Sequence, residues 1–309
     1  MPEPTPPLWR SLLFVPVTNE RFVSRARDRG ADAVQLDLED SVAASQKRAA
    51  RDALPDAVQT VAGGPADVLV RVNRPWRLAL PDLEAAVLPG VTALTLPKVP
   101  GPQHVAEIAG LVGELERERG LPPGAVRLVA AIEDPAALAQ AHAIAAASPR
   151  VAGLTLGGED FALAIGVEPD EDVLLSANQA IVFGATAAGV TPLGTLGSIA
   201  SFADPDAYRE MVRRSRRFGF QGASAIHPNQ VPILNEEFAP SGGEVEEAER
   251  IVAAFEDAER RGEAAVAVDG RMVDVPVVER ARRTVARRDA IESRAGRPRQ
   301  RQAHVTPGR

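Results

Sequence analysis

Cysteine is absent from the 309-residue chain. Disulfide bonds, thiolate metal ligands and cysteine nucleophiles are therefore excluded, and carboxylates and four histidines are left to provide metal or acid–base chemistry. Lysine is also scarce: only Lys47 and Lys98 occur, so arginine supplies nearly all of the positive charge. A mechanism that needs a lysine amine has only these two positions available.

Long hydrophobic runs and a surplus of basic residues are missing as well. No stretch approaches the roughly 20 apolar residues that a membrane-spanning helix needs. Acidic residues outnumber basic ones by 42 to 35, and the resulting net charge of -7 disfavours a broad nucleic-acid surface. Hydrophobic residues make up 45% of the chain, too many for a disordered protein. We expect a folded, cytoplasmic protein whose partners are neither membranes nor nucleic acids.

Both ends of the chain are poor in large apolar side chains. Residues 1–8 contain four prolines and show no signal-peptide pattern, and we expect them to form a disordered arm. Residues 291–309 combine arginine with glycine, proline and glutamine, and we expect a disordered basic tail there.

Between the ends, short aliphatic runs alternate with amphipathic, helix-like stretches. Near-continuous apolar runs of this kind are typical of parallel strands covered by helices. Eight such units within residues 9–235 predict an α/β fold, a (β/α)8 TIM barrel. An open doubly wound sheet is the competing interpretation, but neither GxGxxG nor GxxxxGK[ST] occurs in the chain. The eight runs are Leu12–Val17, Ala33–Leu38, Val68–Val72, Ala93–Leu96, Val126–Ile132, Val151–Leu156, Thr191–Ile199 and Gly222–Ile226.

Residues 236–290 follow a different pattern. Residues 241–261 predict a helix with a serine cap. Asp269-Gly270, between two short alternating apolar runs, predicts a hairpin, and a last helix is expected over residues 276–291. Strands that follow a closed barrel cannot join its sheet. We therefore expect a helix–hairpin–helix extension that acts as a lid or as an oligomerisation arm.

Charged and glycine residues follow the predicted strands at their carboxyl ends, where TIM barrels carry their active sites. Converging carboxylates repel one another, and a divalent cation relieves that repulsion. Mg²⁺ typically takes one or two carboxylates, and Glu133 and Asp160, from adjacent strands, form the best pair. Asp134 is alternatively a helix cap before Pro135. The other rim residues are Asp37, Glu39, Asp40, Arg71, Lys98, Gly157, Gly158 and His227.

Three basic side chains at this rim allow more than one interpretation. Arg71 lies between valines and either binds a substrate carboxylate or pairs internally with Asp37 or Glu39. Lys98 either forms a Schiff base or neutralises the nearby acids. His227 precedes a proline and either transfers protons or fixes the turn.

Seven segments, taken together and in order, resemble the citrate lyase beta subunit family of the HpcH/HpaI aldolase superfamily. The resemblance covers residues 10–284. The segments are Arg10-Ser11-Leu12-Leu13-Phe14-Val15-Pro16, Asp37-Leu38-Glu39-Asp40-Ser41-Val42, Val70-Arg71-Val72-Asn73, Leu96-Pro97-Lys98-Val99, Ile132-Glu133, Gly157-Gly158-Glu159-Asp160-Phe161 and Ala225-Ile226-His227-Pro228-Asn229-Gln230-Val231.

The resemblance implies an Mg²⁺-dependent carbon–carbon lyase of the aldolase type. Such an enzyme cleaves a 3-hydroxyacyl-CoA thioester, such as a citryl, malyl or citramalyl thioester, to acetyl-CoA and a 2-oxo acid, or it forms the thioester from them. It also implies that Glu133 and Asp160 hold the metal and that Arg71 polarises the oxo acid. Backbone N–H groups of Gly157 and Gly158 would bind the acid beside Glu133. Around them, Asp37, Glu39, Asp40 and Lys98 would support the site.

The same resemblance assigns a role to the hairpin. The segment from Asp269 to Asp274 is similar to the family segment that places a catalytic aspartate, here Asp274, over a neighbouring subunit's site. This implies a homo-oligomer, with a trimer favoured. A thioesterase or a malate-synthase-like condensing enzyme on the same site, a Schiff-base aldolase on Lys98, and a non-catalytic subunit of a lyase complex with an acyl-carrier partner are the alternatives.

Overall fold

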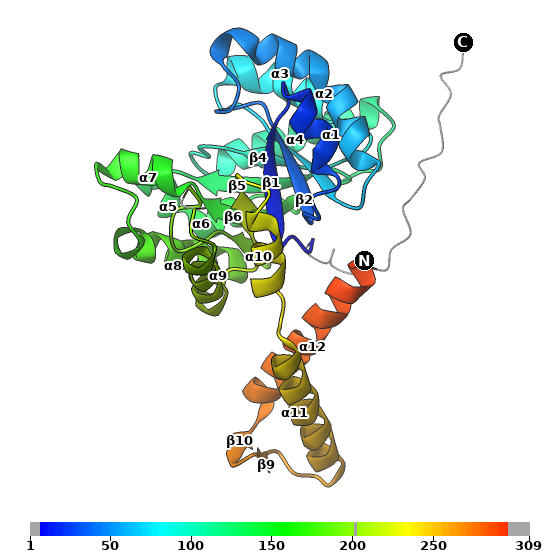
Figure 1. The fold of residues 1–309 in the computed structure, drawn as a ribbon, viewed down its shortest axis with the longest axis vertical. Coiled ribbons are helices and arrows are strands. Elements are labelled where there is room, and N and C mark those ends of the chain that lie inside the picture. Colours follow the sequence, from blue (N-terminus) through cyan, green and yellow to red (C-terminus); the bar gives the residue numbers. More distant parts are fainter. Residues whose placement is uncertain (1–6, 201–202, 296–309) are drawn as a thin grey trace. The chain divides into compact units, whose positions relative to one another are not determined.

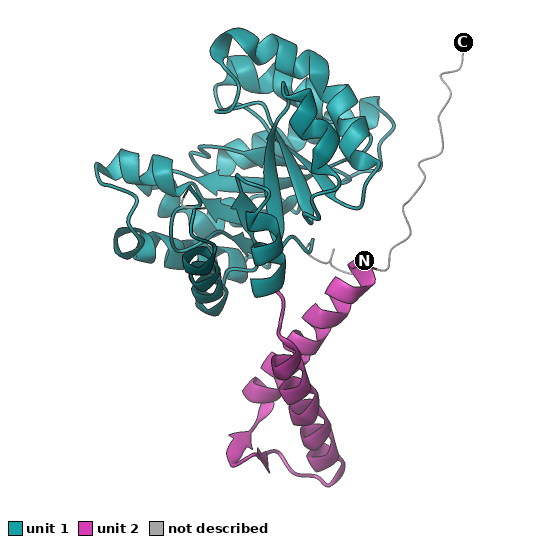
Figure 2. Ribbon diagram, in the orientation of Figure 1, with its two compact units in different colours: residues 1–238 teal, residues 239–309 magenta. Residues whose placement is uncertain are grey.

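A computed structural model describes residues 7–200 and 203–295 of the chain. The chain divides into two compact units after Phe238 (Figure 2), whereas the sequence placed the boundary at residue 235. Residues 1–6 of the expected arm and residues 296–309 of the expected tail lie outside the described residues. No described helix is both long enough and apolar enough to cross a membrane.

The first unit contains eight parallel strands with helices around them (Figure 1), as the sequence predicted. Each strand pairs with its sequence neighbour, and β1 also pairs with β8. A parallel bridge between Leu193 and Gly222 joins the last two strands, and the Gly194 N–H donates to the Gly222 carbonyl (2.8 Å), so the barrel is closed. The strands are β1 (Ser11–Pro16), β2 (Ala33–Asp37), β3 (Asp67–Arg71), β4 (Val91–Leu96), β5 (Arg127–Ile132), β6 (Val151–Leu156), β7 (Thr191–Leu193) and β8 (Ala223–Ala225).

Helices cover the outside of the barrel and bury the outward-facing aliphatic side chains of the strands. For example, β2 is buried along its whole length, because it lies between the barrel interior and this helical layer. The helices of this unit are α1 (Glu20–Ala26), η1 (Ala44–Gln46), α2 (Lys47–Ala62), α3 (Trp76–Ala86), α4 (Pro102–Glu118), α5 (Pro135–Leu138), α6 (Ala141–Ala145), α7 (Gly158–Ile165), α8 (Glu171–Ala187), α9 (Pro205–Phe218) and α10 (Gln230–Glu237).

The interior of the barrel changes from apolar to polar along the strands. A separate cluster of buried apolar residues takes one member from each of β1 to β7. Because side chains alternate between the two faces of a strand, the residue two positions later faces the same way. That step leads from Ala33 to Gln35 and from Leu69 to Arg71, so the polar residues lie nearer the carboxyl ends. The apolar cluster consists of Trp9, Leu12, Ala33, Leu69, Ala93, Val129, Ala152 and Leu193.

Strand β7 is shorter than predicted. The apolar run extends to Ile199, but strand geometry ends at Leu193. Gly194 has a φ of 151°, and a β-carbon there would lie 2.9 Å from Cε1 of Phe220, so the chain turns at a position that favours glycine. The residues from Gly194 to Ile199 line a cavity instead of continuing the sheet.

The second unit contains the predicted helix, hairpin and helix: α11 (Gly242–Arg260), β9 (Val266–Val268), β10 (Arg271–Val273) and α12 (Val275–Ala295). Ser241 and Glu244 form a capping box at the start of α11. Asp269 (φ 49°) and Gly270 (φ 76°) both adopt the left-handed conformation that a tight hairpin turn requires. Phe255, Val273 and Val278 form the apolar core of this unit.

The last helix runs further than the sequence analysis predicted. Its end was expected at Ile291, yet α12 continues to Ala295. Glutamate, arginine and alanine, which make up most of these last residues, are strong helix formers, and they extend a helix that is already nucleated. The expectation of disorder from residue 291 is therefore wrong for residues 291–295.

Candidate active site

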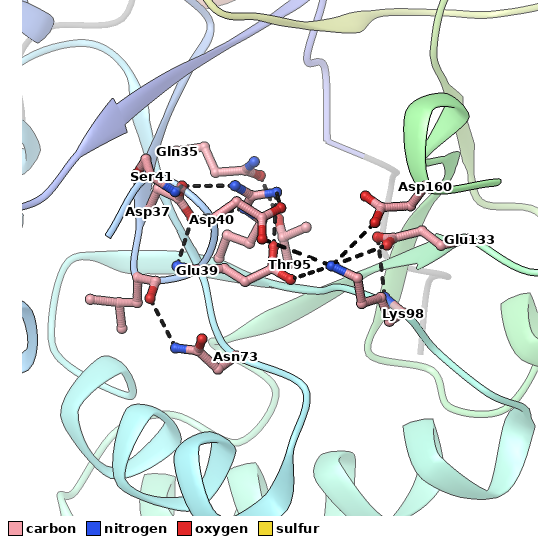
Figure 3. Close-up of polar contacts among 12 residues, drawn as sticks. Gln35, Asp37, Glu39, Asp40, Ser41, Asn73, Thr95, Lys98, Glu133 and Asp160 are labelled. Carbon is pink, nitrogen blue, oxygen red and sulfur yellow. Dashed lines mark hydrogen bonds and ion pairs between the residues drawn. The ribbon is translucent and has the colours of Figure 1, made fainter. Parts of the chain in front are cut away.

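The polar ends of the strands surround a cavity of about 860 Å³. Asp37, Arg71, Glu133 and Asp160 all line it. The barrel thus brings together residues that lie far apart in the sequence, such as Asp37, Glu133 and Asp160 (Figure 3). Gln35 and Thr95 line its inner part, where the Thr95 hydroxyl donates to the Gln35 side-chain carbonyl (2.5 Å). This cavity lies where TIM barrels carry their active sites.

Arg71 forms a bidentate ion pair with Asp37. Its Nε and Nη2 atoms each donate to one Asp37 oxygen at 2.7 Å, and Nη1 lies 2.9 Å from Oε2 of Glu39. The guanidinium also lies over the Phe14 ring, 4.7 Å from its centroid. Of the two interpretations of Arg71, the internal ion pair is therefore present, and the side chain still lines the cavity. Burial raises the pKa of Asp37, but Arg71 and the hydrogen bonds from Ser41 and Glu39 together lower it by more, so the net pKa lies below its ordinary value.

Lys98 lies at the centre of the carboxylates. Its ammonium nitrogen is 2.9 Å from Oε1 of Glu39, 3.6 Å from Oδ1 of Asp160 and 3.7 Å from Oε2 of Glu133 (Figure 3). Its backbone has a φ of 50°, and its N–H donates to Oε1 of Glu133 (3.2 Å). Burial lowers the pKa of Lys98, but the surrounding carboxylates raise it by more. The net pKa therefore lies above its ordinary value, and the side chain stays charged. A charged amine cannot attack a carbonyl, and the neutralising role is the one that this geometry supports.

Glu133 is the most perturbed carboxylate of the site. Its side chain is only 8% exposed, and its Oε2 atom is buried without a hydrogen-bond partner. Burial raises the pKa of Glu133 to about 7, although the Lys98 charge opposes the change. Gly157 lies directly against this side chain, and a β-carbon on Gly157 would lie 2.5 Å from the Glu133 Cγ.

Asp160 belongs to the first turn of α7, whose N-cap is Gly157. The Gly157 N–H donates to the Ile132 carbonyl (2.9 Å) and is therefore used inside the barrel. Gly158 is at the first position of α7, where an N–H has no carbonyl within the helix to bind. Of the two glycines expected to bind a carboxylate, only Gly158 thus has an N–H group that takes no part in the hydrogen bonds of the sheet or the helix.

The donor set fits Mg²⁺ better than a metal that needs many protein ligands. Among the described residues, no three histidine or acidic side chains come together as a metal-binding group. Mg²⁺ requires only one or two carboxylates, because water and substrate oxygens complete its coordination. Glu133, which has a buried oxygen without a hydrogen-bond partner, and Asp160, which shares the Lys98 ammonium with it, provide such a pair.

Two neighbouring rim residues have mainly structural contacts. Asp134 accepts a hydrogen bond from the Ala137 N–H (2.9 Å) and caps α5, as one of its two interpretations predicted. His227 lines the cavity, and its Nδ1 accepts from the Asn229 N–H (3.2 Å), which fixes the turn. Gln230, which the sequence analysis did not single out, accepts from the Ile226 and His227 N–H groups and holds the same turn.

Asp274 belongs to the second unit and lies between β10 and α12. Its Oδ1 accepts a weak hydrogen bond from the Val277 N–H (3.4 Å). It is thus part of the described C-terminal unit, separate in the chain from the barrel residues.

One wall of the cavity was not predicted from the sequence. Arg21, Phe22, Arg25 and Arg29, in and just after α1, line it, although charged residues of an amphipathic helix look like an ordinary solvated face. Asn178 of α8 lines it as well. The only sequence signal for α1 was the spacing of its arginines, which is too common to be diagnostic.

Comparison with known proteins identifies relatives along nearly the whole chain. The family described as HpcH/HpaI aldolase/citrate lyase matches residues 10–228. Citrate lyase subunit beta of Escherichia coli K12 is 37% identical over 283 residues, which cover 90% of this chain and 92% of the relative. A (3S)-malyl-CoA thioesterase of Cereibacter sphaeroides is 35% identical over 288 residues, 92% of this chain and 95% of the relative.

Solved structures agree with these relatives. The CitE protein of Mycobacterium tuberculosis, determined in complex with magnesium, acetoacetate and coenzyme A, matches with a TM-score of 0.72 and 28% identity. The match covers 92% of this chain and 98% of that structure.

Proposed function

The chain belongs to the HpcH/HpaI aldolase/citrate lyase family, and on that premise we propose that it cleaves a 3-hydroxyacyl-CoA thioester to acetyl-CoA and a 2-oxo acid, or forms the thioester from them. It is a carbon–carbon lyase that uses Mg²⁺. The observation that carries the proposal is the pair Glu133 and Asp160, with one buried carboxylate oxygen that has no hydrogen-bond partner, in a cavity of about 860 Å³.

Glu133 and Asp160 would hold the metal, which when bound supplies positive charge to the oxygens of the 2-oxo acid. Arg71 adds a second positive charge, fixed in place by Asp37 and Glu39. The N–H group of Gly158 at the start of α7 binds the acid's carboxylate, since helix N-termini favour anions. Together these groups stabilise the oxyanion that develops as the carbon–carbon bond changes.

The α1 wall suits the nucleotide part of a CoA thioester. Arg21, Arg25 and Arg29 offer charge for phosphate groups, and Phe22, 52% exposed, offers a surface for a ring. This wall is the feature of the cavity that supports a CoA thioester over a small free acid. A relative named as a malyl-CoA thioesterase is consistent with the same class of substrate.

We assign the proton transfer at the acetyl carbon to Asp274, supplied by a neighbouring copy of the chain. In the cleavage direction, the C3 hydroxyl loses its proton to water and its oxygen becomes the keto oxygen of the 2-oxo acid. The bond between C2 and C3 breaks, its electron pair moves to the thioester carbonyl, and Asp274 delivers a proton to C2. The C-terminal unit then acts as a lid and oligomerisation arm in a homo-oligomer, with a trimer favoured. Activity alone or with an acyl-carrier partner is compatible with this assignment.

A panel of 3-hydroxyacyl-CoA thioesters, assayed with and without Mg²⁺ for both free CoA and 2-oxo acid, tests the activity. The expected result is Mg²⁺-dependent release of a 2-oxo acid together with acetyl-CoA. Free CoA without a carbon–carbon cleavage product would identify a thioesterase instead. Glu133→Ala protein that retains full lyase activity would refute the assigned site.

Complementation tests the placement of Asp274. Asp274→Asn and Glu133→Gln proteins are each expected to be inactive. If Asp274 acts on a neighbouring copy, subunits exchanged between the two variants regain part of the activity, because some sites then receive both intact residues. Mixed oligomers that stay inactive would contradict the placement.

A further inference from the structure

Asn178 has a buried side-chain amide whose nitrogen lacks a hydrogen-bond partner. It lies on α8, its side chain is 2% exposed, and its Nδ2 atom has no hydrogen-bond partner. An unpaired buried amide costs free energy, and native proteins rarely keep one without a reason. Asn178 is also among the residues that line the active-site cavity.

Leucine side chains line the cavity together with Asn178. Leu174, one turn earlier on α8, lines the cavity too and packs against α7, where a β-carbon on Gly158 would lie 3.1 Å from its Cδ1. Leu193 and Leu196 contribute further apolar surface to the lining. An amide beside apolar surface fits a small-molecule site in which a few polar groups fix orientation and specificity.

The position of α8 favours the acid half of the substrate over the nucleotide half. The arginines of the α1 wall follow β1, whereas α8 connects β6 to β7. In the strand order, β7 is separated from β1 by β8, and β6 carries the Gly157–Asp160 segment at its end. Asn178 therefore lies on the α7 side of the cavity, near Gly158 through Leu174, and away from the α1 wall.

We propose that Asn178 is a specificity-determining residue whose amide donates a hydrogen bond to a second oxygen-bearing group on the 2-oxo acid, beyond the carboxylate and carbonyl at the reacting end. The inference rests on the proposed function and narrows its substrate class. The preferred acids carry a terminal carboxylate or carbonyl, and acids that end in a methyl group leave the Asn178 amide unpaired. Sites built around such a polar group discriminate strongly against analogues that lack its partner.

Equilibrium binding of two matched acids tests the proposal without requiring turnover. Oxaloacetate and 2-oxobutyrate share a four-carbon chain and differ in a terminal carboxylate against a methyl group. With Mg²⁺ present, isothermal titration calorimetry should show wild-type protein binding oxaloacetate the more tightly. Asn178→Leu should reduce that preference by about 10- to 100-fold, the range for a hydrogen bond to a charged group.

Two further variants separate this role from a structural one. Asn178→Asp, nearly the same size, should weaken oxaloacetate binding while 2-oxobutyrate binding changes less, because like charges repel. Thr191→Val is the matched control, since Thr191 Oγ1 is also buried without a partner but does not line the cavity. It should leave the preference unchanged.

The outcomes distinguish the two hypotheses. If both Asn178 variants keep the wild-type preference, or if Thr191→Val alters it equally, the role of Asn178 is refuted while the lyase assignment stands. If wild-type protein binds neither acid in the presence of Mg²⁺, the proposed function itself fails, and the inference fails with it.

Discussion

Gly157 and Glu133 are in such close contact that a β-carbon on Gly157 would lie 2.5 Å from Cγ and 2.9 Å from Cδ of Glu133. Gly157 has a φ of -83°, which any residue can adopt, so the requirement for glycine here is one of space and not of backbone conformation. The proposed metal ligand thus packs against Gly157, the residue between β6 and α7, where a side chain would not fit.

Gly157→Ala should therefore displace the Glu133 carboxylate and weaken Mg²⁺ binding while the barrel stays folded. Metal titration by calorimetry, with circular dichroism to confirm the fold, measures both effects. Gly110→Ala is the matched control, because Gly110 lies within α4 and a β-carbon there meets nothing within 4 Å. It should bind Mg²⁺ normally and be more stable by about 0.5–1 kcal/mol. Normal Mg²⁺ affinity in Gly157→Ala would contradict the expected contact.

Removal of either proposed ligand should abolish metal binding. Glu133→Gln or Asp160→Asn is expected to weaken Mg²⁺ binding by more than about 100-fold, since even partners that only contact a ligand cost about 10- to 100-fold. EDTA should stop lyase activity in wild-type protein, and excess Mg²⁺ should restore it. Asp134→Ala provides the control: it loses the α5 cap at a cost of about 1 kcal/mol but keeps its metal affinity.

The stability of the metal-free protein should depend on pH through Glu133. Burial raises its pKa from 4.5 to about 7 on folding, so the protonated carboxyl favours the folded state. This contribution is fully present below pH 4.5 and is lost as the pH rises through about 7. Urea unfolding with EDTA should show that wild-type protein loses stability over this range relative to Glu133→Gln, which lacks the titrating group. Parallel pH profiles of the two proteins would argue against the raised pKa.

The Arg71–Asp37 pair should be strongly coupled. Arg71→Met leaves the Asp37 carboxylate, only 1% exposed, without its counter-charge, and the free energy of unfolding should fall by about 3–5 kcal/mol. Arg71→Met/Asp37→Leu removes both charges and should recover part of that loss. Denaturant titrations of the wild type, both single variants and the double variant provide the cycle. Strictly additive changes would show that the two side chains act independently.

Lys98 should resist covalent trapping. The neighbouring carboxylates raise its pKa, so it stays an ammonium ion and cannot form a Schiff base. Incubation with pyruvate and borohydride, followed by mass spectrometry, should leave both lysines unmodified. Lys47 serves as an internal comparison, since its ammonium donates to the Leu38 and Glu39 carbonyls. Selective labelling of Lys98 would revive the Schiff-base mechanism.

Periodicity and turn chemistry were sufficient to predict the barrel and the C-terminal helix–hairpin–helix. Asp269-Gly270 fixed the hairpin because a tight turn needs left-handed residues, and Ser241 fixed the start of α11 through its cap. Local signals failed where long-range contacts decided the outcome. The β7 strand stops at Leu193 because the chain turns at Gly194 against Phe220, which an apolar run does not reveal.

The sequence by itself determined which residue types reach the rim of the barrel, since strand ends and their polar residues are encoded locally and with a period of two. Only the tertiary structure decided how they pair: Arg71 with Asp37, Lys98 among the carboxylates, Glu133 against Gly157, and Asn178 unpaired at the cavity wall. The reason is physical. Ion pairing, burial and packing depend on distances between strands and helices far apart in the chain, and those distances exist only once the barrel closes.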